Sequence, residues 1–202
     1  MIRVGITGGI GTGKTFICNI FRFLGIPVYD ADLRAKQLVE ESLPVKQEII
    51  KLFGSAAFNE QGQYNRKLIS SKIFQQPELK QALEHIIHPA VRKDSLSWFK
   101  YYEDLHLAYA LKEAALLYES GSHLDLDQVI VVDAPLELRI QRLIQREGWN
   151  EDEIKSRMSN QWPQEEKLRR ADFIMLNDGK SPVIPQVWLI HHHLLKLSAL
   201  SL

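Results

Sequence analysis

The stretch Gly8-Gly9-Ile10-Gly11-Thr12-Gly13-Lys14-Thr15 matches the phosphate-loop pattern GxxxxGK[ST] and directly follows the apolar segment Ile2–Ile6. Glycines let the backbone turn sharply and bring N–H groups close to phosphate oxygens, where side chains would collide. Lys14 supplies a positive charge for the β- and γ-phosphates, and Thr15 a hydroxyl for Mg²⁺. The apolar spacing predicts a helix over 14–24, so the phosphates would lie at a helix N-terminus. A glycine turn used only for packing is the alternative, but the whole pattern favours binding of a nucleoside triphosphate.

The composition is that of an ordinary globular protein. The chain has 202 residues, of which 45% are hydrophobic and 25% charged, which suits one nucleotide-binding domain with appendages. Its formal net charge of zero gives no indication of a nucleic-acid or membrane partner. The single cysteine, Cys18, reads as a small core residue and indicates a reducing compartment. Because Met1–Ile6 enters the first strand directly and no apolar run reaches about 18 residues, we expect a cytoplasmic protein.

Strand-like segments alternate with helical ones, which predicts an α/β fold with a parallel, doubly wound sheet. The expected strands are 2–6, 26–29, 105–111, 129–132 and 173–176, and a final helix over 183–200 is expected to pack on the sheet. The helical, polar stretch between them reads as an insertion. The predicted organisation is a nucleotide-binding core over 1–43, 104–135 and 171–202, a helical insertion over 44–103 and a lid over 136–170.

Two carboxylates follow the second expected strand. Asp30 and Asp32 are two residues apart in a segment taken as extended, so their side chains should point the same way. Ligands in open α/β sheets bind at this carboxyl edge, where a carboxylate could accept the proton of an attacking hydroxyl or help to hold Mg²⁺. Asp32 also suits the N-cap of the next helix, and the two roles are compatible.

Three arginines, Arg139, Arg142 and Arg146, share one face of a predicted helix. Guanidinium groups on a lid would stabilise the charge on a phosphoryl group in transfer, and a solvated arginine face is the alternative. The following region, 148–170, reads as an exposed, charged flap.

A histidine before a proline marks the insertion. Pro89 should push His88 out of helical geometry, leaving its ring at a helix break beside Arg92; a plain interhelical turn is the alternative. Asp133 ends an apolar run and is a weak candidate for a Walker B aspartate. His191-His192-His193 point in different directions on a helix and read as solvated surface, not as a metal site.

Taken in order, several motifs resemble the dephospho-CoA kinase family across nearly the whole chain. They are the phosphate loop, Asp30-Ala31-Asp32, Ile87-His88-Pro89, Leu116-Leu117-Tyr118-Glu119-Ser120-Gly121, Asp133-Ala134-Pro135 with Arg142 and Arg146, Gln161, Lys167, Ala171-Asp172-Phe173 and Asn177-Asp178-Gly179. The resemblance implies a P-loop kinase with a helical CoA-binding domain and a lid. It implies transfer of the ATP γ-phosphate to the 3′-hydroxyl of the dephospho-CoA ribose with Mg²⁺, and it leaves the oligomeric state open.

The resemblance also implies residue roles. Nucleotide-binding residues would be Gly8, Gly9, Gly11, Thr12, Gly13, Lys14, Thr15, Phe16, Asn177 and Gly179. Lys14, Asp32 and Arg142 would be catalytic, with Asp32 as the general base and Thr15 as the Mg²⁺ ligand. Asp30, Asp32, His88 and Arg92 would contact the acceptor. The family's usual proline is Ala115 here, which leaves open whether Glu113 or Asp133 assists the metal, and its frequent glutamine is Arg139.

Two other classes share the phosphate loop. A GTPase-like switch would need an Asn-Lys-x-Asp stretch for guanine, and Asn177-Asp178-Gly179-Lys180 lacks that order. A kinase for another small hydroxyl acceptor would share the loop, the lid and the base, and only the insertion with His88-Pro89 separates it from the family above.

Overall fold

The computed structural model describes residues 1–200, which form two compact units: Met1–Asp30 with the chain from Trp98 onward, and Ala31–Ser97. The first unit contains β1 (Ile2–Thr7), α1 (Lys14–Phe23), β2 (Val28–Asp30), β3 (Tyr109–Glu113), η2 (Ser122–Asp125), β4 (Gln128–Asp133), α6 (Leu136–Glu147), α7 (Glu151–Met158), α8 (Gln164–Arg169), β5 (Phe173–Leu176) and α9 (Val183–Leu200). The second contains α2 (Ala31–Glu41), α3 (Leu43–Phe53), η1 (Ser55–Ala57), α4 (Arg66–Gln75) and most of α5 (Glu78–Asp104).

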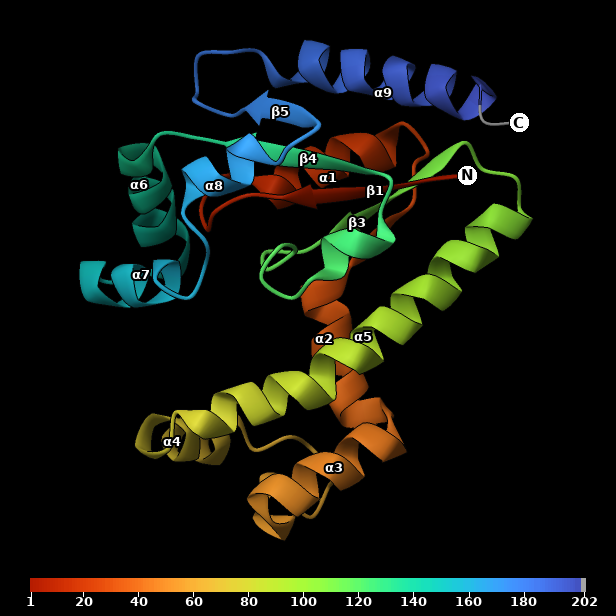
Figure 1. Ribbon diagram of the computed structural model, residues 1–202. Helices are drawn as coiled ribbons and strands as arrows, with labels where there is room; N and C mark the ends of the chain where they lie inside the picture. The colour runs from red at the N-terminus through yellow and green to blue at the C-terminus, as the bar shows by residue number, and fades with distance from the viewer. Residues whose placement is uncertain (201–202) are drawn as a thin grey trace. The chain divides into compact units, whose positions relative to one another are not determined.

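The five strands form one sheet in the order β2-β3-β1-β4-β5, and every neighbouring pair is parallel (Figure 1). This confirms the predicted α/β class. The phosphate-loop strand β1 is central, so its carboxyl end lies between those of β3 and β4. Strand β3 begins later than predicted, at Tyr109, because the chain turns just before it, with His106 in the left-handed region at φ 57°.

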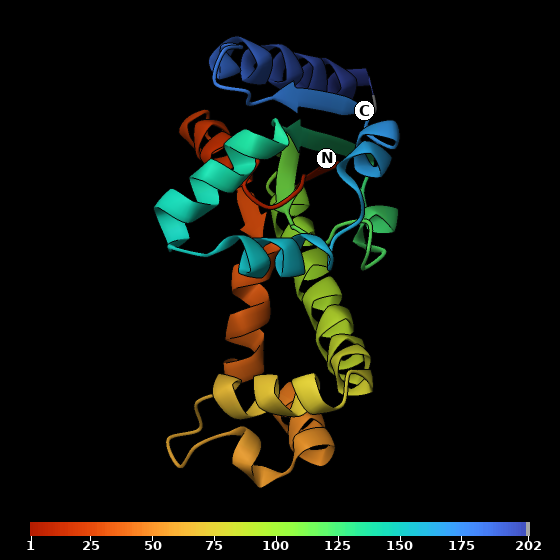
Figure 2. The same ribbon diagram turned by 90° about the vertical axis from the view of Figure 1, so that its left-hand side faces the viewer.

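Two helices cover one face of the sheet. Phe21 of α1 and Leu194 of α9 are fully buried in one apolar cluster with residues of β1, β3, β4 and β5. Helix α9 lies along β5 (Figure 2). The predicted packing of the C-terminal helix on the sheet is therefore confirmed. Cys18 also belongs to this cluster, which confirms the prediction that it is a small core residue.

The second unit has its own apolar core, built from α2, α3, α4 and α5 around Ile49 and Phe53. Helix α5 crosses α2 in Figure 1, and the two helices lie next to each other in Figure 2. Arg34 of α2 donates from Nε and Nη2 to the two carboxylate oxygens of Asp94 on α5, at 3.1 and 2.8 Å. This bidentate pair fixes the register of the two helices. Helix α2 belongs to the second unit. This unit therefore starts at Ala31, whereas the insertion was predicted to start at residue 44.

The predicted helix break at His88 is wrong. Pro89 lies inside α5, a continuous helix of 27 residues, and His88 has ordinary helical neighbours on both sides. Proline removes one N–H bond and disfavours helical geometry in the residue before it, but packing of the flanking turns overrides that local preference. Ile86, Ile87 and Ala90 pack against the core of the second unit.

Within residues 1–200, no helix is long and apolar enough to cross a membrane.

Truncation of two nearby phenylalanines in the first unit should lower the free energy of unfolding by very different amounts. Phe21 is fully buried, whereas Phe23 is 92% exposed. Phe21→Ala should lower the free energy of unfolding by about 3–5 kcal/mol, through lost burial and an unfilled cavity. Phe23→Ala, the matched control, should change it by less than about 0.5 kcal/mol. Urea denaturation of both variants measures this, and equal losses would contradict the described packing.

Candidate active site

The phosphate loop turns from β1 into α1 through glycines with positive φ. Gly11 and Gly13 have φ of 82° and 89°, a region that glycine enters without strain. An added Cβ at Gly11 would lie 2.7 Å from the carbonyl oxygen of Arg139, and one at Gly13 would collide with the Asn177 amide. Gly13 is also the N-cap of α1, whose first N–H groups have no acceptor within the helix. The loop thus has the geometry of an anion site at a helix N-terminus.

Two glutamines hold the outer side of the loop. The Gly9 N–H donates to Oε1 of Gln164 and the Ile10 N–H donates to Oε1 of Gln161, each at 2.8 Å. The Gln164 amide also donates to Oδ1 of Asp133 at 3.0 Å. These bonds tie the start of the loop to the end of β4. Gln164 was not among the predicted site residues, because a neutral amide in a charged helical stretch produces no sequence pattern that marks it.

The three arginines of α6 have different surroundings, although they share the predicted helix face. Arg139 is only 8% exposed and its Nε donates to the Ile10 carbonyl at 2.9 Å, so it braces the loop from outside. Burial lowers the pKa of Arg139, and Asp133 and Glu165 oppose this shift. Arg146 is exposed and pairs with Glu147 at 2.7 Å. Arg146 is therefore solvated, as the alternative prediction for this helix face states.

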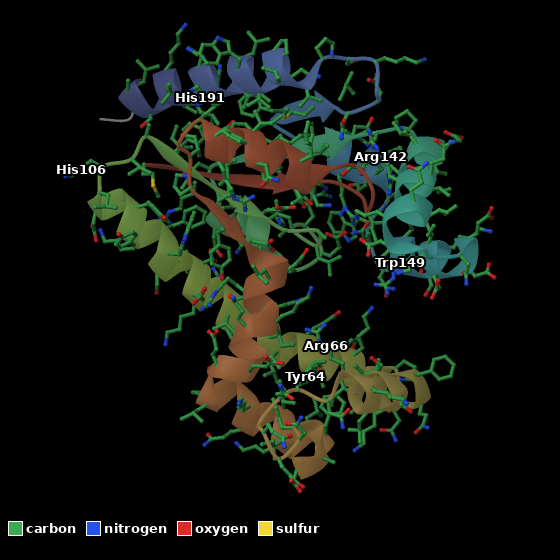
Figure 3. The ribbon with its side chains drawn as sticks, turned by 180° about the vertical axis from the view of Figure 1, so that it is seen from behind. Tyr64, Arg66, His106, Arg142, Trp149 and His191 are labelled. Atoms are coloured by element: carbon green, nitrogen blue, oxygen red, sulfur yellow. The ribbon has the colours of Figure 1, made fainter. Side chains whose placement is uncertain are left out.

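Arg142 lies between the phosphate loop and the segment after β5 (Figure 3). Its guanidinium donates to the Asn177 carbonyl at 2.9 Å and, through longer contacts of 3.5 and 3.4 Å, to the carbonyls of Gly11 and Thr12. The Asn177 amide donates to the Thr12 carbonyl at 2.7 Å. Arg142 and Asn177, both predicted site residues, thus meet at the loop.

The carboxylate of Glu113 faces Thr15 at the carboxyl end of β3. The Thr15 hydroxyl donates to Oε1 of Glu113 at 2.9 Å, while Oε2 is buried without a hydrogen-bond partner among the described residues. Burial and, to a smaller extent, the negative charge of Glu113 raise the pKa of the nearby Cys18 thiol, so the thiol stays protonated. An unpaired oxygen beside the threonine hydroxyl fits a hydrated divalent cation, because Mg²⁺ takes few protein oxygens and keeps several waters.

The structure corrects the expected geometry of Asp30 and Asp32. Strand β2 ends at Asp30 and α2 begins at Ala31, so Asp32 lies in the first helical turn and the alternation of an extended strand does not apply. Asp32 is therefore not the N-cap. Its position is still favourable for a negative charge, because the N-terminus of a helix carries partial positive charge. Asp32 is exposed and Asp30 is half-buried.

His88 and Arg92 lie one turn apart on α5, so they share a helix face within the second unit. Burial lowers the pKa of His88, and the charge of Glu84 opposes this shift. The structure thus brings two of the predicted acceptor residues together on one helix, without the break that the sequence predicted.

The predicted exposed flap contains a fully buried lysine. Lys167 of α8 is 0% exposed, pairs with Oε1 of Glu119 at 2.8 Å and donates to the Ala115 carbonyl at 3.0 Å. Oε1 of Glu119 also accepts the Trp162 N–H at 2.7 Å. The prediction of exposure is wrong at Lys167, because a specific ion pair compensates for burying its charge. This pair anchors α8, and with it Gln164, against the sheet.

One of the three consecutive histidines also departs from its predicted role as solvated surface. His191 is half-buried, with Nδ1 2.6 Å from the Tyr109 hydroxyl, because it follows the buried stripe of α9. His192 and His193 are exposed, as predicted. Within residues 1–200, no group of three or more His, Cys, Asp or Glu side chains is placed to hold a metal ion.

Two further predicted nucleotide residues are Phe16 in α1 and Gly179 after β5. Phe16 is 55% exposed on the first turn of α1. Gly179 follows β5 with φ 78°. Next to Gly179 in the sequence, Asp178 accepts from the N–H groups of Lys180 and Ser181, which lowers the pKa of its carboxyl. The turn after β5 is therefore ordered by its own aspartate.

A pair of glycine variants separates backbone strain from damage to the loop. Gly13→Ala and Gly25→Ala both place alanine at positive φ, 89° and 80°, and each should cost about 1–2 kcal/mol of stability. Only at Gly13 would the new methyl collide, with Asn177, whereas nothing lies within 4 Å at Gly25. Titration with ATP should show affinity reduced roughly tenfold or more in Gly13→Ala alone, a loss of about 1.4 kcal/mol. Equal affinity of the two variants would refute the loop assignment.

Comparisons with known proteins identify relatives of the whole chain. The family model described as dephospho-CoA kinase matches residues 2–182. The dephospho-CoA kinase of Bacteroides fragilis is 35% identical over 186 residues, covering 92% of this chain and 89% of that protein. A solved structure from Thermus thermophilus superposes with a TM-score of 0.79 at 30% identity, covering 96% of each chain. The dephospho-CoA kinase from Campylobacter jejuni superposes with a TM-score of 0.70 at 27% identity, covering 99% and 98%. The chain therefore belongs to the dephospho-CoA kinase family.

Proposed function

We propose a residue-level route for the reaction of this family, in which the γ-phosphoryl group of ATP passes to the 3′-hydroxyl of the dephospho-CoA ribose, giving CoA and ADP. As a member of the family, the protein is an ATP-dependent phosphotransferase. The observation that carries the route is the phosphate loop, with positive φ at Gly11 and Gly13 and α1 starting directly behind it. Phosphoryl transfer needs chiefly positioning and charge neutralisation, which such a loop supplies.

The loop and Lys14 hold the triphosphate. The backbone N–H groups of the later part of the loop and of the start of α1, from Gly13 to Phe16, bind phosphate oxygens. The N–H groups of Gly9 and Ile10 donate to the two glutamines instead. The Lys14 ammonium donates to the Gly8 carbonyl at 3.0 Å, so it already folds over the loop and is within reach of the β- and γ-phosphates. Asn177 and Gly179 contribute the edge of the site towards the adenine.

Thr15 and Glu113 hold Mg²⁺ in this proposal. The Thr15 hydroxyl and the unpaired Oε2 of Glu113 are the oxygens that would hold the hydrated ion. When bound, Mg²⁺ would supply positive charge against the β- and γ-phosphates. Asp133 is the less suitable carboxylate, because the Gln164 amide already donates to its Oδ1.

The metal assignment predicts opposite results for two carboxylate variants. Glu113→Gln should raise the Mg²⁺ concentration for half-maximal activity roughly 10- to 100-fold, the usual range for loss of an outer-shell partner. Asp133→Asn, the matched control, should leave this concentration unchanged. Activity measured against Mg²⁺ at saturating ATP tests both variants, and a shift confined to Asp133→Asn would reverse the assignment.

Asp32 is the general base, which takes the proton of the attacking 3′-hydroxyl. It follows the carboxyl end of β2 by two residues and is exposed on the first turn of α2. The Arg34–Asp94 pair holds that turn of α2 against α5, which limits its motion. Asp30, His88 and Arg92 contribute to acceptor binding, with Arg92 supplying positive charge for a phosphorylated substrate.

Loss of the base should separate binding from chemistry. Asp32→Asn should reduce kcat roughly 10²- to 10⁴-fold, the usual contribution of a general base, and leave ATP affinity nearly intact. Glu48→Gln, which changes an exposed acid of the same unit that pairs with Lys51, is the control and should keep full turnover. ADP release and ATP titration give the two readouts. Wild-type kcat in Asp32→Asn would rule out this role.

Arg142 acts on the transferring group. Its longer contacts to the Gly11 and Thr12 carbonyls are weak, so bound phosphate oxygens would compete for the same guanidinium.

A cytoplasmic location is part of the same proposal. Its support is the single, buried thiol of Cys18, which is expected in a protein of a reducing compartment.

The function itself is tested by the choice of acceptor. ADP formation from Mg-ATP is measured with dephospho-CoA, adenosine, AMP and pantetheine phosphate in parallel, and the products are identified by mass. One added phosphate on dephospho-CoA alone supports the proposal. Turnover with another acceptor only would keep the kinase fold and reject dephospho-CoA as the substrate.

A further inference from the structure

The side-chain amide of Gln164 joins the phosphate loop to the end of β4, and no step of the proposed route uses it. Its oxygen accepts the Gly9 N–H at 2.8 Å, and its nitrogen donates to the Val132 carbonyl and to Oδ1 of Asp133, each at 3.0 Å. The partners determine the orientation of the amide, because a backbone N–H only donates and a carbonyl only accepts. The carboxylate of Asp133 is therefore connected to the first turn of the loop through one amide group.

The backbone on both sides of Gln164 is fixed. Before it in the sequence, the Trp162 N–H donates to Oε1 of Glu119 at 2.7 Å, and after it the buried Lys167 ammonium pairs with the same oxygen at 2.8 Å. Pro163, whose ring restricts φ, is the N-cap of α8 directly before Gln164. A side chain carried by such a segment has few alternative positions, so Gln164 can hold the group that it bonds.

The loop on the other side of this amide is tightly packed. An added Cβ at Gly9 would collide with the Arg139 guanidinium, and one at Gly8 would collide with the Val132 carbonyl oxygen. The Arg139 Nε donates to the Ile10 carbonyl at 2.9 Å. The first turn of the loop is therefore held between side chains of α6 and α8.

Asp133 supports both of the side chains that hold this turn. Its Oδ1 accepts from the Gln164 amide, and its negative charge opposes the fall in the pKa of Arg139 that burial causes. An aspartate at the end of a strand beside a phosphate loop is a candidate for assisting Mg²⁺. In this structure, however, the carboxylate that faces Thr15 with an oxygen unpaired among residues 1–200 is that of Glu113.

We propose that Asp133 and Gln164 are positioning residues for ATP binding. The Asp133 carboxylate orients the Gln164 amide, and the amide fixes the Gly9 N–H, so that the N–H groups from Gly13 to Phe16 stay turned towards the phosphates. The inference deepens the proposed function, because it assumes that these later N–H groups bind ATP, and it assigns Asp133 to the loop instead of the metal. A loop that is already fixed loses less conformational freedom when ATP binds, which raises its affinity.

One substitution removes the donor of this amide and keeps its acceptor. Gln164→Glu retains an oxygen for the Gly9 N–H but places a second carboxylate beside Asp133, which is unfavourable for two like charges. Affinity for ATP, measured by titration without any acceptor, should fall roughly 10- to 100-fold, the effect of losing a hydrogen bond to a charged group. Gln141→Glu makes the same chemical change at an exposed position of α6 and should bind ATP as the wild type does. Equal affinity of the two variants would contradict the proposal.

A second substitution exchanges the two roles. When Gln164→Glu is combined with Asp133→Asn, the amide introduced at position 133 can donate to the carboxylate introduced at position 164. Affinity for ATP should then recover roughly fivefold or more relative to Gln164→Glu alone, the coupling expected of residues in contact. Two independent losses of structure would add instead, so an affinity at or below that of Gln164→Glu overturns the inference.

Titration without Mg²⁺ separates a role at the loop from a role at the metal. Asp133→Leu removes the oxygen that orients the amide. Relative to the wild type, its loss of ATP affinity should be as large in EDTA as in Mg²⁺. A loss that appears only with Mg²⁺ would assign Asp133 to the metal and overturn the inference.

Hydrogen exchange in the wild-type protein provides a test that does not depend on variant folding. Without nucleotide, the Gly9 N–H should exchange at least roughly tenfold more slowly than the Thr15 N–H, which lies in the first turn of α1 and lacks an acceptor inside the helix. Saturating ADP should then protect Thr15. Exchange of Gly9 as fast as that of Thr15 before ADP is added overturns the inference.

These measurements use ATP or ADP alone, so they remain valid whichever acceptor the enzyme uses. If the wild-type enzyme does not phosphorylate dephospho-CoA, the proposed function fails, and the titrations still decide the role of Gln164. If the wild-type enzyme phosphorylates it but Gln164→Glu binds ATP normally, only the positioning role is wrong.

Discussion

The outer backbone groups of the phosphate loop are bonded to side chains from distant parts of the chain. Gln161 and Gln164 accept its first N–H groups, while Arg139 and Asn177 donate to its carbonyls. A loop that binds phosphate must turn its remaining N–H groups to one side, and it can be rigid only if its other polar groups are satisfied elsewhere. The positions of α6, α8 and the turn after β5 therefore all contribute to one short loop.

Buried or half-buried ion pairs hold the elements that supply these side chains. Lys167 and Glu119 join α8 to the segment after β3, and Arg34 and Asp94 join α2 to α5. Breaking such a pair would leave a charge without a partner, so each pair strongly favours one arrangement of its elements. In the first unit this arrangement determines where Gln164 meets the loop. In the second it determines which side of α2 faces α5.

Elements with a strong local pattern agree with their prediction. The strands β1, β4 and β5 and the helices α1 and α9 lie where apolar periodicity placed them, because burial of one face sets both the pattern and the packing. The predictions that differ are local rules overridden by tertiary contacts. Pro89 stays inside α5 because neighbouring turns are packed, and His191 is half-buried because it adjoins the buried stripe of α9.

The α/β class, the phosphate loop and the resemblance to a kinase family can be predicted from the sequence, because glycine spacing and apolar periodicity are properties of neighbouring residues. Which polar side chains meet depends on the folded arrangement. Gln164 reaches the loop from 155 residues away, and Glu113 reaches Thr15 across 98 residues. The separate environments of Arg139, Arg142 and Arg146 have the same origin. One helix face looks uniform in the sequence, but each residue on it has a different neighbour in space, and that neighbour sets its burial and charge.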